Sequence, residues 1–305
     1  MNPAWSVIVF TTVAGAAQGL VVVVALLTLF ALRLSQRFAD SALWLAFAML
    51  LVALAASFLH LGRPERAWRA AAMWRTSWLS REVIVLPAFA GWVVLWALWG
   101  RAAPLVFAAG ALLLALLLWW CTAMIYACLR FIQEWAHPLT IVNYTLIGLA
   151  SGAVLATALA AALGEAAVQH AVAPWALIAT ALAAAARWLA LRRNAALKPK
   201  STLQSATGIR GQRVVQMAMG MTGGSFNTRE FFHHRTLAAL RWVKLGFVLL
   251  AFALPSALLL AGLGSGSRWA FLLAALVQAP GLLAERWFFF AQARHPQNLY
   301  YQVVG

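Results

Sequence analysis

The stretch from residue 41 to residue 82 reads SALWLAFAMLLVALAASFLHLGRPERAWRAAAMWRTSWLSRE and contains the pattern that decides the fold. Its first half is an apolar run of about 20 residues, long enough for a helix to cross the ~30 Å hydrocarbon core of a bilayer. Its second half carries five arginines among several tryptophans. An apolar run followed by a basic segment is typical of a span that ends at the inner face of a membrane.

The same alternation of apolar and basic segments extends over the whole chain. Hydrophobic residues make up 64% of its 305 residues, and the runs lack the period-2 alternation of membrane β-strands. The predicted fold class is therefore all-α. We expect one integral membrane domain over residues 1–305, a polytopic bundle of eight transmembrane helices with a long loop at 192–236 between the sixth and seventh. The predicted spans are Trp5–Leu32, Ser41–Leu61, Val83–Gly100, Pro104–Leu129, Leu139–Leu163, Ala166–Leu191, Leu237–Leu263 and Trp269–Phe290.

The basic residues predict the orientation of these spans. Lysine and arginine total 23 against 7 acidic residues, and the gaps between spans carry them unevenly. Gaps on one side hold about four times as many basic residues as gaps on the other, and the positive-inside rule places the side with more basic residues in the cytoplasm. We therefore expect both termini and the 192–236 loop to be cytoplasmic, in a bacterial inner membrane. A basic inner face beside anionic lipid accounts for the net charge of +16 without a nucleic-acid partner.

Spacings within the predicted spans bear on helix packing and on cofactors. Cys121 and Cys128 lie two helical turns apart in the fourth span, so they cannot form a disulfide. The pairs Gly15–Gly19 and Gly148–Gly152 predict close helix contacts. With no other cysteine and no paired histidines at matching depths, the chain is expected to bind no haem, iron–sulfur cluster or other metal itself.

Polar residues gather where the 41–82 stretch leaves the membrane and re-enters it. Gly62 and Pro64 are expected to end the second helix just after His60, and Glu82 is expected in the first turn of the third helix. A histidine and a carboxylate at that depth can hydrogen-bond a quinone ring and exchange its protons. The alternative is an ordinary interfacial histidine beside an acid that starts a helix.

Glu285 and Arg286 interrupt the eighth predicted span about a turn and a half before its cytoplasmic end. Charges at that depth pair with a neighbour or face an internal cavity. We expect these two either to lie on a proton path or to form a structural ion pair. Arg241 and Lys244 of the seventh span are the candidate partners for the ion pair.

The 192–236 loop is too long and too rich in glycine, methionine and aromatic residues to be an idle tether. Flexible and aromatic side chains mixed with arginine suit a docking surface for another protein. A loop packed on its own helices is the alternative. The candidate docking residues are Arg210, Arg213, Phe226, Asn227, Arg229, Phe231 and Phe232.

The run HLGRPERAW at 60–68, followed by SREV at 80–83, resembles the membrane-anchor subunits of the DMSO reductase family. Those eight-helix proteins tie a molybdopterin catalytic subunit and an iron–sulfur subunit to the quinone pool, and their span number and lengths fit essentially the whole chain. The resemblance implies quinone binding at His60 and Glu82. Arg63, Trp68 and Trp74 are candidate walls of that site.

Three stretches are similar to one branch of that family, the anchors of cytoplasmic sulfite:quinone oxidoreductases. They are HLGRP at 60–64, MGMTGGSFNTREFFHH at 219–234 and AERWFFFAQARHPQNLYYQ at 284–302. This similarity implies that electrons from sulfite pass through a molybdopterin subunit and an iron–sulfur subunit, docked on the 62–82 and 192–236 loops, to ubiquinone or menaquinone. A cytoplasmic catalytic partner agrees with the orientation predicted from the charges. A quinol-oxidising anchor of a DMSO or polysulfide reductase remains open, as does a transporter, although the chain shows no two-half repeat.

Overall fold

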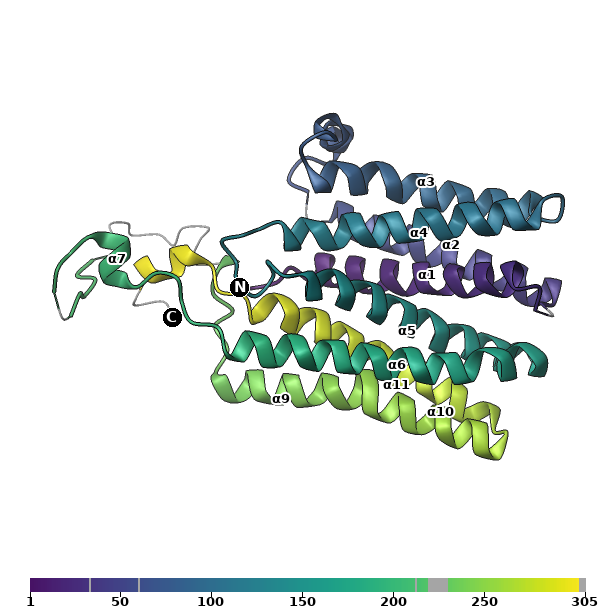
Figure 1. Ribbon diagram of the computed structural model, residues 1–305. Helices are drawn as coiled ribbons and strands as arrows, with labels where there is room; N and C mark the ends of the chain where they lie inside the picture. Colours follow the sequence, from purple (N-terminus) through teal and green to yellow (C-terminus); the bar gives the residue numbers. More distant parts are fainter. Residues whose placement is uncertain (33, 60, 212, 219–229, 302–305) are drawn as a thin grey trace.

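In the part of the chain that the structure describes, eight helices are long and apolar enough to cross a membrane, and they run side by side (Figure 1). The computed structural model describes residues 1–305 except 33, 60, 212, 219–229 and 302–305. It contains no β-strand among those residues, so the predicted all-α membrane bundle is confirmed. The spans are α1 (Trp5–Leu29), α2 (Gln36–Phe58), α3 (Trp78–Trp99), α4 (Pro104–Ala127), α5 (Pro138–Leu163), α6 (Ala166–Ala195), the continuous segment from α9 (Leu237–Phe247) through η2 (Val248–Ala253) to α10 (Leu254–Ser265), and α11 (Arg268–Ala291).

Helices α2 and α3 begin five residues earlier than predicted, because polar caps extend them beyond their apolar runs. The Ser35 side chain accepts a hydrogen bond from the Phe38 amide at 3.1 Å, and the Ser77 side chain accepts one from the Ser80 amide at 3.3 Å. Such side chains satisfy amides that the first helical turn leaves free. As a result Glu82 lies in the second turn of α3, and the prediction of a first-turn position was wrong.

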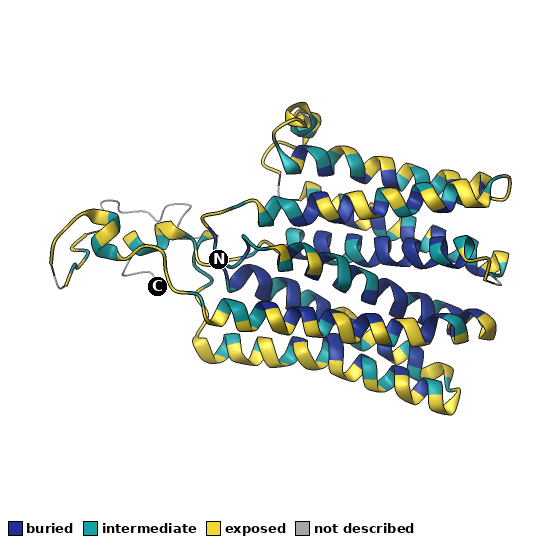
Figure 2. Ribbon diagram, viewed as in Figure 1, coloured by how far each residue is buried: buried dark blue, intermediate teal, exposed yellow. Residues whose placement is uncertain are grey.

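Helix α1 forms the centre of the bundle and packs against α2, α4 and α5, and burial is concentrated on α1 and α5 (Figure 2). The predicted glycine contacts explain how α1 and α5 pack. A Cβ atom on Gly152 would fall on the backbone of Gly19 and Leu20, and one on Gly19 would fall on the Gly148 carbonyl. Small residues at these positions let two membrane helices approach to backbone contact.

The seventh span contains a short π-helical segment, η2, with an identifiable cause. Pro255 follows it and has no N–H to offer the carbonyl of Ala251, four residues earlier. Gln278 of α11 replaces that donor, its Nε2 lying 3.2 Å from the Ala251 oxygen. A Cβ on Gly281 would meet the backbone of Leu250 and Ala251, so α11 lies directly against η2.

The N-terminus and the last described residues, up to Tyr301, lie at one end of the bundle (Figure 1), as an even number of spans requires. The 3-10 helix η1 (Pro64–Met73) and the segment after α6, which contains α7 (Leu203–Thr207), connect helices at the same end, which we call the loop end. The C-terminal 3-10 helix η3 (Pro296–Tyr300) packs on α7, where the Tyr300 hydroxyl donates to the Ala206 carbonyl at 3.1 Å. The long loop and the C-terminal tail therefore pack together beyond the helix ends.

Candidate functional site

Glu82 is a buried carboxylate near the loop end of α3, with only 4% of the residue exposed. The hydroxyl of Thr122, on α4, donates a hydrogen bond to its Oε1 atom. The short turn between α3 and α4 makes the two helices antiparallel neighbours, which brings these side chains together. A carboxylate inside an apolar bundle is costly unless it is hydrogen-bonded or faces an internal cavity. The side chain is thus held inside the bundle.

Arg81 fastens the loop before α3 to the start of that helix. Its Nε atom donates to the Trp74 carbonyl at 2.9 Å and its Nη2 atom to the Arg75 carbonyl at 2.8 Å. Its guanidinium also lies 4.0 Å from the centroid of the Trp78 ring. These contacts place Trp74 beside the first turn of α3, one turn from Glu82.

Three other residues predicted for the quinone site lie in η1 or next to it: Arg63 precedes η1, Trp68 lies within it and Trp74 follows it. His60 falls outside the described residues. Arg63 and Trp68 are exposed, the latter 74%, and Trp74 is 52% exposed. No residue of η1 is buried, and its arginines alternate with tryptophan and alanine. Such a segment suits the interface between lipid headgroups and water, where aromatic rings are stable without full burial.

Glu285 forms the centre of a buried ion cluster. Its Oε1 atom lies 2.7 Å from Nε of Arg187 on α6, and its Oε2 atom lies 2.7 Å from Nε of Arg286. The Arg286 guanidinium lies 4.2 Å from the centroid of the Tyr144 ring, and that of Arg187 lies 5.6 Å from the Phe247 ring. The three charged side chains are at most 4% exposed, so the cluster carries a net positive charge inside the bundle.

The prediction that Arg241 or Lys244 pairs with Glu285 was wrong. Arg241 and Lys244 are exposed on α9, whereas the sixth span supplies the second guanidinium. Arg187 lies within the predicted span Ala166–Leu191 and was not among the expected partners. An arginine eight residues inside a membrane helix is itself a signal of internal pairing, and that signal would have found it.

Four of the predicted docking residues lie in described parts of the long loop, which packs on the C-terminal tail. Arg210 and Arg213 are exposed, and Phe231 and Phe232 are partly buried. The Phe231 ring stacks on His295 of the tail, with centroids 3.9 Å apart, and burial lowers the pKa of His295. The loop therefore packs partly on its own chain through Phe231 and leaves Arg210 and Arg213 exposed. Three predicted docking residues lie outside the described residues: Phe226, Asn227 and Arg229.

Metal ligands are not grouped in the described residues, where no three histidine, cysteine or acidic side chains could hold an ion together. Cys121 is buried in α4, and Cys128 lies exposed at the end of the same helix. Neither forms a disulfide. The polar chemistry of the bundle is thus carried by carboxylates, guanidiniums and hydroxyls.

Comparisons with known proteins agree with this architecture. Residues 1–258 match the sequence model of a family described as DMSO reductase anchor subunit (DmsC). The chain is also 48% identical to a subunit of the sulfite dehydrogenase of Allochromatium vinosum, with 100% of each chain covered. The family match includes Glu82 and Thr122, and the full-length similarity extends over α11 and its ion cluster.

Proposed function

Because the chain belongs to the DMSO reductase anchor subunit family, we propose that it is the quinone-binding membrane anchor of a heterotrimeric molybdopterin and iron–sulfur oxidoreductase. The name of its relative supports sulfite as the electron donor. Electrons pass from sulfite through a molybdopterin subunit and an iron–sulfur subunit to ubiquinone or menaquinone bound at the loop end. This chain binds the quinone and exchanges its protons, and the partner subunits contain the redox centres.

The loop end faces the cytoplasm of a bacterium in this proposal, and the spans lie in the inner membrane. Two observations support this orientation. Most basic residues outside the spans belong to that end, as the positive-inside rule requires of a cytoplasmic face. The same end carries the 62–82 and 192–236 loops, whose arginines and aromatic rings offer the docking surface for the iron–sulfur subunit.

The observation that carries the proposal is the buried Glu82, hydrogen-bonded to Thr122 one turn from an interfacial, tryptophan-rich segment. Reduction of a quinone takes up two protons, and a positioned carboxylate can deliver them. A quinone ring also needs flat apolar contacts, which the exposed rings of Trp68 and Trp74 can provide. His60 and Arg63 lie close to this segment in the sequence, and an imidazole can hydrogen-bond a quinone oxygen.

The test is a comparison of two electron acceptors in the complex purified with its native partners. One assay follows sulfite-dependent reduction of a soluble quinone analogue, and the other follows reduction of a dye that accepts electrons directly from the partner subunits. Glu82→Gln is expected to lower the quinone-coupled rate by about 10²-fold or more while the dye rate stays at the parental value. His60→Ala is expected to act in the same direction. Glu165→Gln, at the opposite end of the bundle, is the matched control.

Other outcomes would change the proposal in defined ways. Equal quinone rates for Glu82→Gln and Glu165→Gln would show that Glu82 is not part of the site. Partners and molybdenum that co-purify without sulfite activity would favour a quinol-oxidising anchor of a reductase. A chain that purifies without partners and supports flux of a small molecule in vesicles would instead be a transporter.

A further inference from the structure

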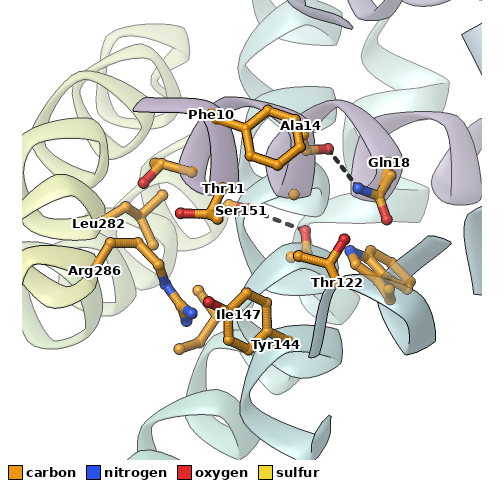
Figure 3. A pocket seen from close by; sticks show the side chains of 14 residues that line it. Phe10, Thr11, Ala14, Gln18, Thr122, Tyr144, Ile147, Ser151, Leu282 and Arg286 are labelled. Carbon is orange, nitrogen blue, oxygen red and sulfur yellow. Dashed lines mark hydrogen bonds between the residues drawn. The ribbon is translucent and has the colours of Figure 1, made fainter. Parts of the chain in front are cut away.

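A small internal cavity lies where α1, α4, α5 and α11 meet. Its wall contains Thr122, which donates to Glu82, and Arg286 of the ion cluster. Arg286 lines one side of it, and Thr122 and Gln18 line the other, with Tyr144 between them (Figure 3). Its volume of about 20 Å³ is enough for a water molecule. The cavity wall therefore includes one residue that is hydrogen-bonded to Glu82 of α3 and one that is paired with Glu285 of α11.

Several polar atoms in the cavity wall have no hydrogen-bond partner among the described residues. They are Nε1 of Trp119, Nη1 of Arg286 and Oε1 of Gln18, all from residues at most 4% exposed. Buried polar atoms are almost always hydrogen-bonded in folded proteins, so these atoms require an occupant of the cavity.

The chemistry of the wall identifies that occupant. The N–H groups of Trp119 and Arg286 can only donate, whereas Oε1 of Gln18 can only accept. The Gln18 amide nitrogen already donates to the Ala14 carbonyl at 3.1 Å, which fixes the orientation of its oxygen (Figure 3). A halide would satisfy the two donors and leave Gln18 unpaired, and a metal cation would do the reverse. Water both donates and accepts, and it satisfies all three.

Thr122 joins the cavity to Glu82. Its hydroxyl lines the cavity and donates a hydrogen bond to the Glu82 carboxylate. A hydroxyl that donates one hydrogen bond still has lone pairs with which to accept another. Water in the cavity, the Thr122 hydroxyl and the Glu82 carboxylate can therefore form one continuous line of hydrogen bonds.

The charge of the ion cluster favours proton movement along these hydrogen bonds toward Glu82. Arg187 and Arg286 share the single negative charge of Glu285, so the cavity wall at Arg286 carries excess positive charge. That charge repels an extra proton in the cavity, and the carboxylate at the other end attracts it. Glu285 itself is not among the residues that line the cavity, and each of its carboxylate oxygens lies 2.7 Å from a guanidinium nitrogen.

We propose that water in this cavity exchanges protons with Glu82 through the hydroxyl of Thr122, with Tyr144 and Gln18 as positioning residues. An extra proton on the water passes to the Thr122 oxygen as the Thr122 proton passes to the carboxylate. The hydroxyl is restored, and no electron moves. This inference rests on the proposed function for its purpose, because it supplies protons for quinone reduction.

Infrared spectroscopy of the purified complex tests the relay directly. The band of protonated Glu82 is the carboxylic acid band that is absent from Glu82→Gln. It is recorded in the parent at a pH low enough for the band to be present. After transfer to D₂O, the band should shift at the parental rate in Thr122→Ser, which keeps the hydroxyl, and at least about tenfold more slowly in Thr122→Val. Thr157→Val is the matched control, because its hydroxyl is buried and donates at 2.9 Å to its own helix at Ala153. A parental rate in Thr122→Val would overturn the relay.

Turnover provides the second measurement. Quinone-coupled turnover should fall in Thr122→Val and be restored by a small weak acid such as formate, which carries protons past a broken relay but does not repair packing. Tyr144→Phe keeps the ring under Arg286 and removes only the hydroxyl, so it tests the cavity wall if Thr122→Val fails to fold. Loss without rescue would overturn the relay. Parental turnover of Glu82→Gln would refute the proposed quinone site, while the infrared rates would still decide whether Thr122 passes protons to Glu82.

Discussion

Neutralising Glu285 should destabilise the protein far more than neutralising either of its arginines. Its two carboxylate oxygens each lie 2.7 Å from a guanidinium nitrogen, one on Arg187 and one on Arg286. Glu285→Gln leaves two positive charges together in the bundle interior. Arg187→Gln leaves the Glu285–Arg286 pair, which is neutral. The net charge that remains in the cluster, positive in one variant and zero in the other, therefore distinguishes the two.

The Coulomb energies set the expected sizes. At an effective dielectric constant of about 20, charges about 4 Å apart attract by about 4 kcal/mol, and two guanidiniums about 6 Å apart repel by about 3 kcal/mol. Glu285→Gln loses two attractions, about 8 kcal/mol, whereas Arg187→Gln loses one and relieves the repulsion, about 1 kcal/mol. The recovered solvation of the removed charge offsets part of each loss. We expect the free energy of unfolding to fall by about 3–5 kcal/mol in Glu285→Gln and about 1 kcal/mol in Arg187→Gln.

Titration of the purified protein from mild detergent into dodecyl sulfate, followed by tryptophan fluorescence and circular dichroism, measures this free energy. Arg241→Gln removes an exposed charge from α9 and should stay within about 0.5 kcal/mol of the parent. If Arg187→Gln costs as much as Glu285→Gln, excess positive charge is not what the carboxylate balances, and the electrostatic account of the cluster is refuted.

Three further predictions follow from packing, hydrogen bonding and protonation. Gly152→Leu should force α1 and α5 apart and lower the free energy of unfolding by about 3 kcal/mol. Gly246→Ala, whose Cβ meets open space, should leave the free energy of unfolding unchanged or raise it by up to about 1 kcal/mol. Equal effects of the two variants would contradict the close contact of α1 and α5. Gln278→Leu should cost about 1–3 kcal/mol in the same titration because the buried carbonyl of Ala251 loses its donor, and an unchanged midpoint would argue against that role. Burial lowers the pKa of His295 below its ordinary 6.5, so the undocked tail binds protons more readily than the docked tail. Docking of the tail should therefore be complete above about pH 6.5 and weaken as the pH falls below that value. Limited proteolysis of the tail at several pH values measures this, and stronger protection in acid would show the sign to be wrong.

Much of the fold was predictable because membrane spans depend on local sequence. An apolar run of the right length must form a helix in lipid, where no water can satisfy its backbone, so most span ends fall within a few residues of the prediction. The two starts that were missed, at Ser35 and Ser77, are set by side-chain caps that lie outside the apolar runs. The glycine spacings of α1 and α5 were also visible in the sequence, since only glycine permits that approach.

The candidate site was predictable only in part. Glu82 and Glu285 drew attention because charge inside an apolar run is costly wherever the run packs. Thr122 gave no such signal, since a threonine in a membrane helix commonly bonds to its own backbone, as Thr157 does. The cavity between Thr122 and Arg286 is lined by residues of four helices, so no short stretch of the sequence predicts it.

Local sequence is enough to establish the number of spans, their lengths, the end that carries the basic loops and the family to which the chain belongs, because each depends on residues close together in the chain. Only the packed bundle shows that Thr122 reaches Glu82 and that Arg187, not a residue of the seventh span, pairs with Glu285. It also shows a polar cavity lined by Thr122 and Arg286, each of which contacts one of the two carboxylates. The physical reason is that an apolar surface is equally compatible with many helix neighbours. Which faces meet is settled by packing summed over the whole bundle, and the partners of its buried polar groups follow from that packing.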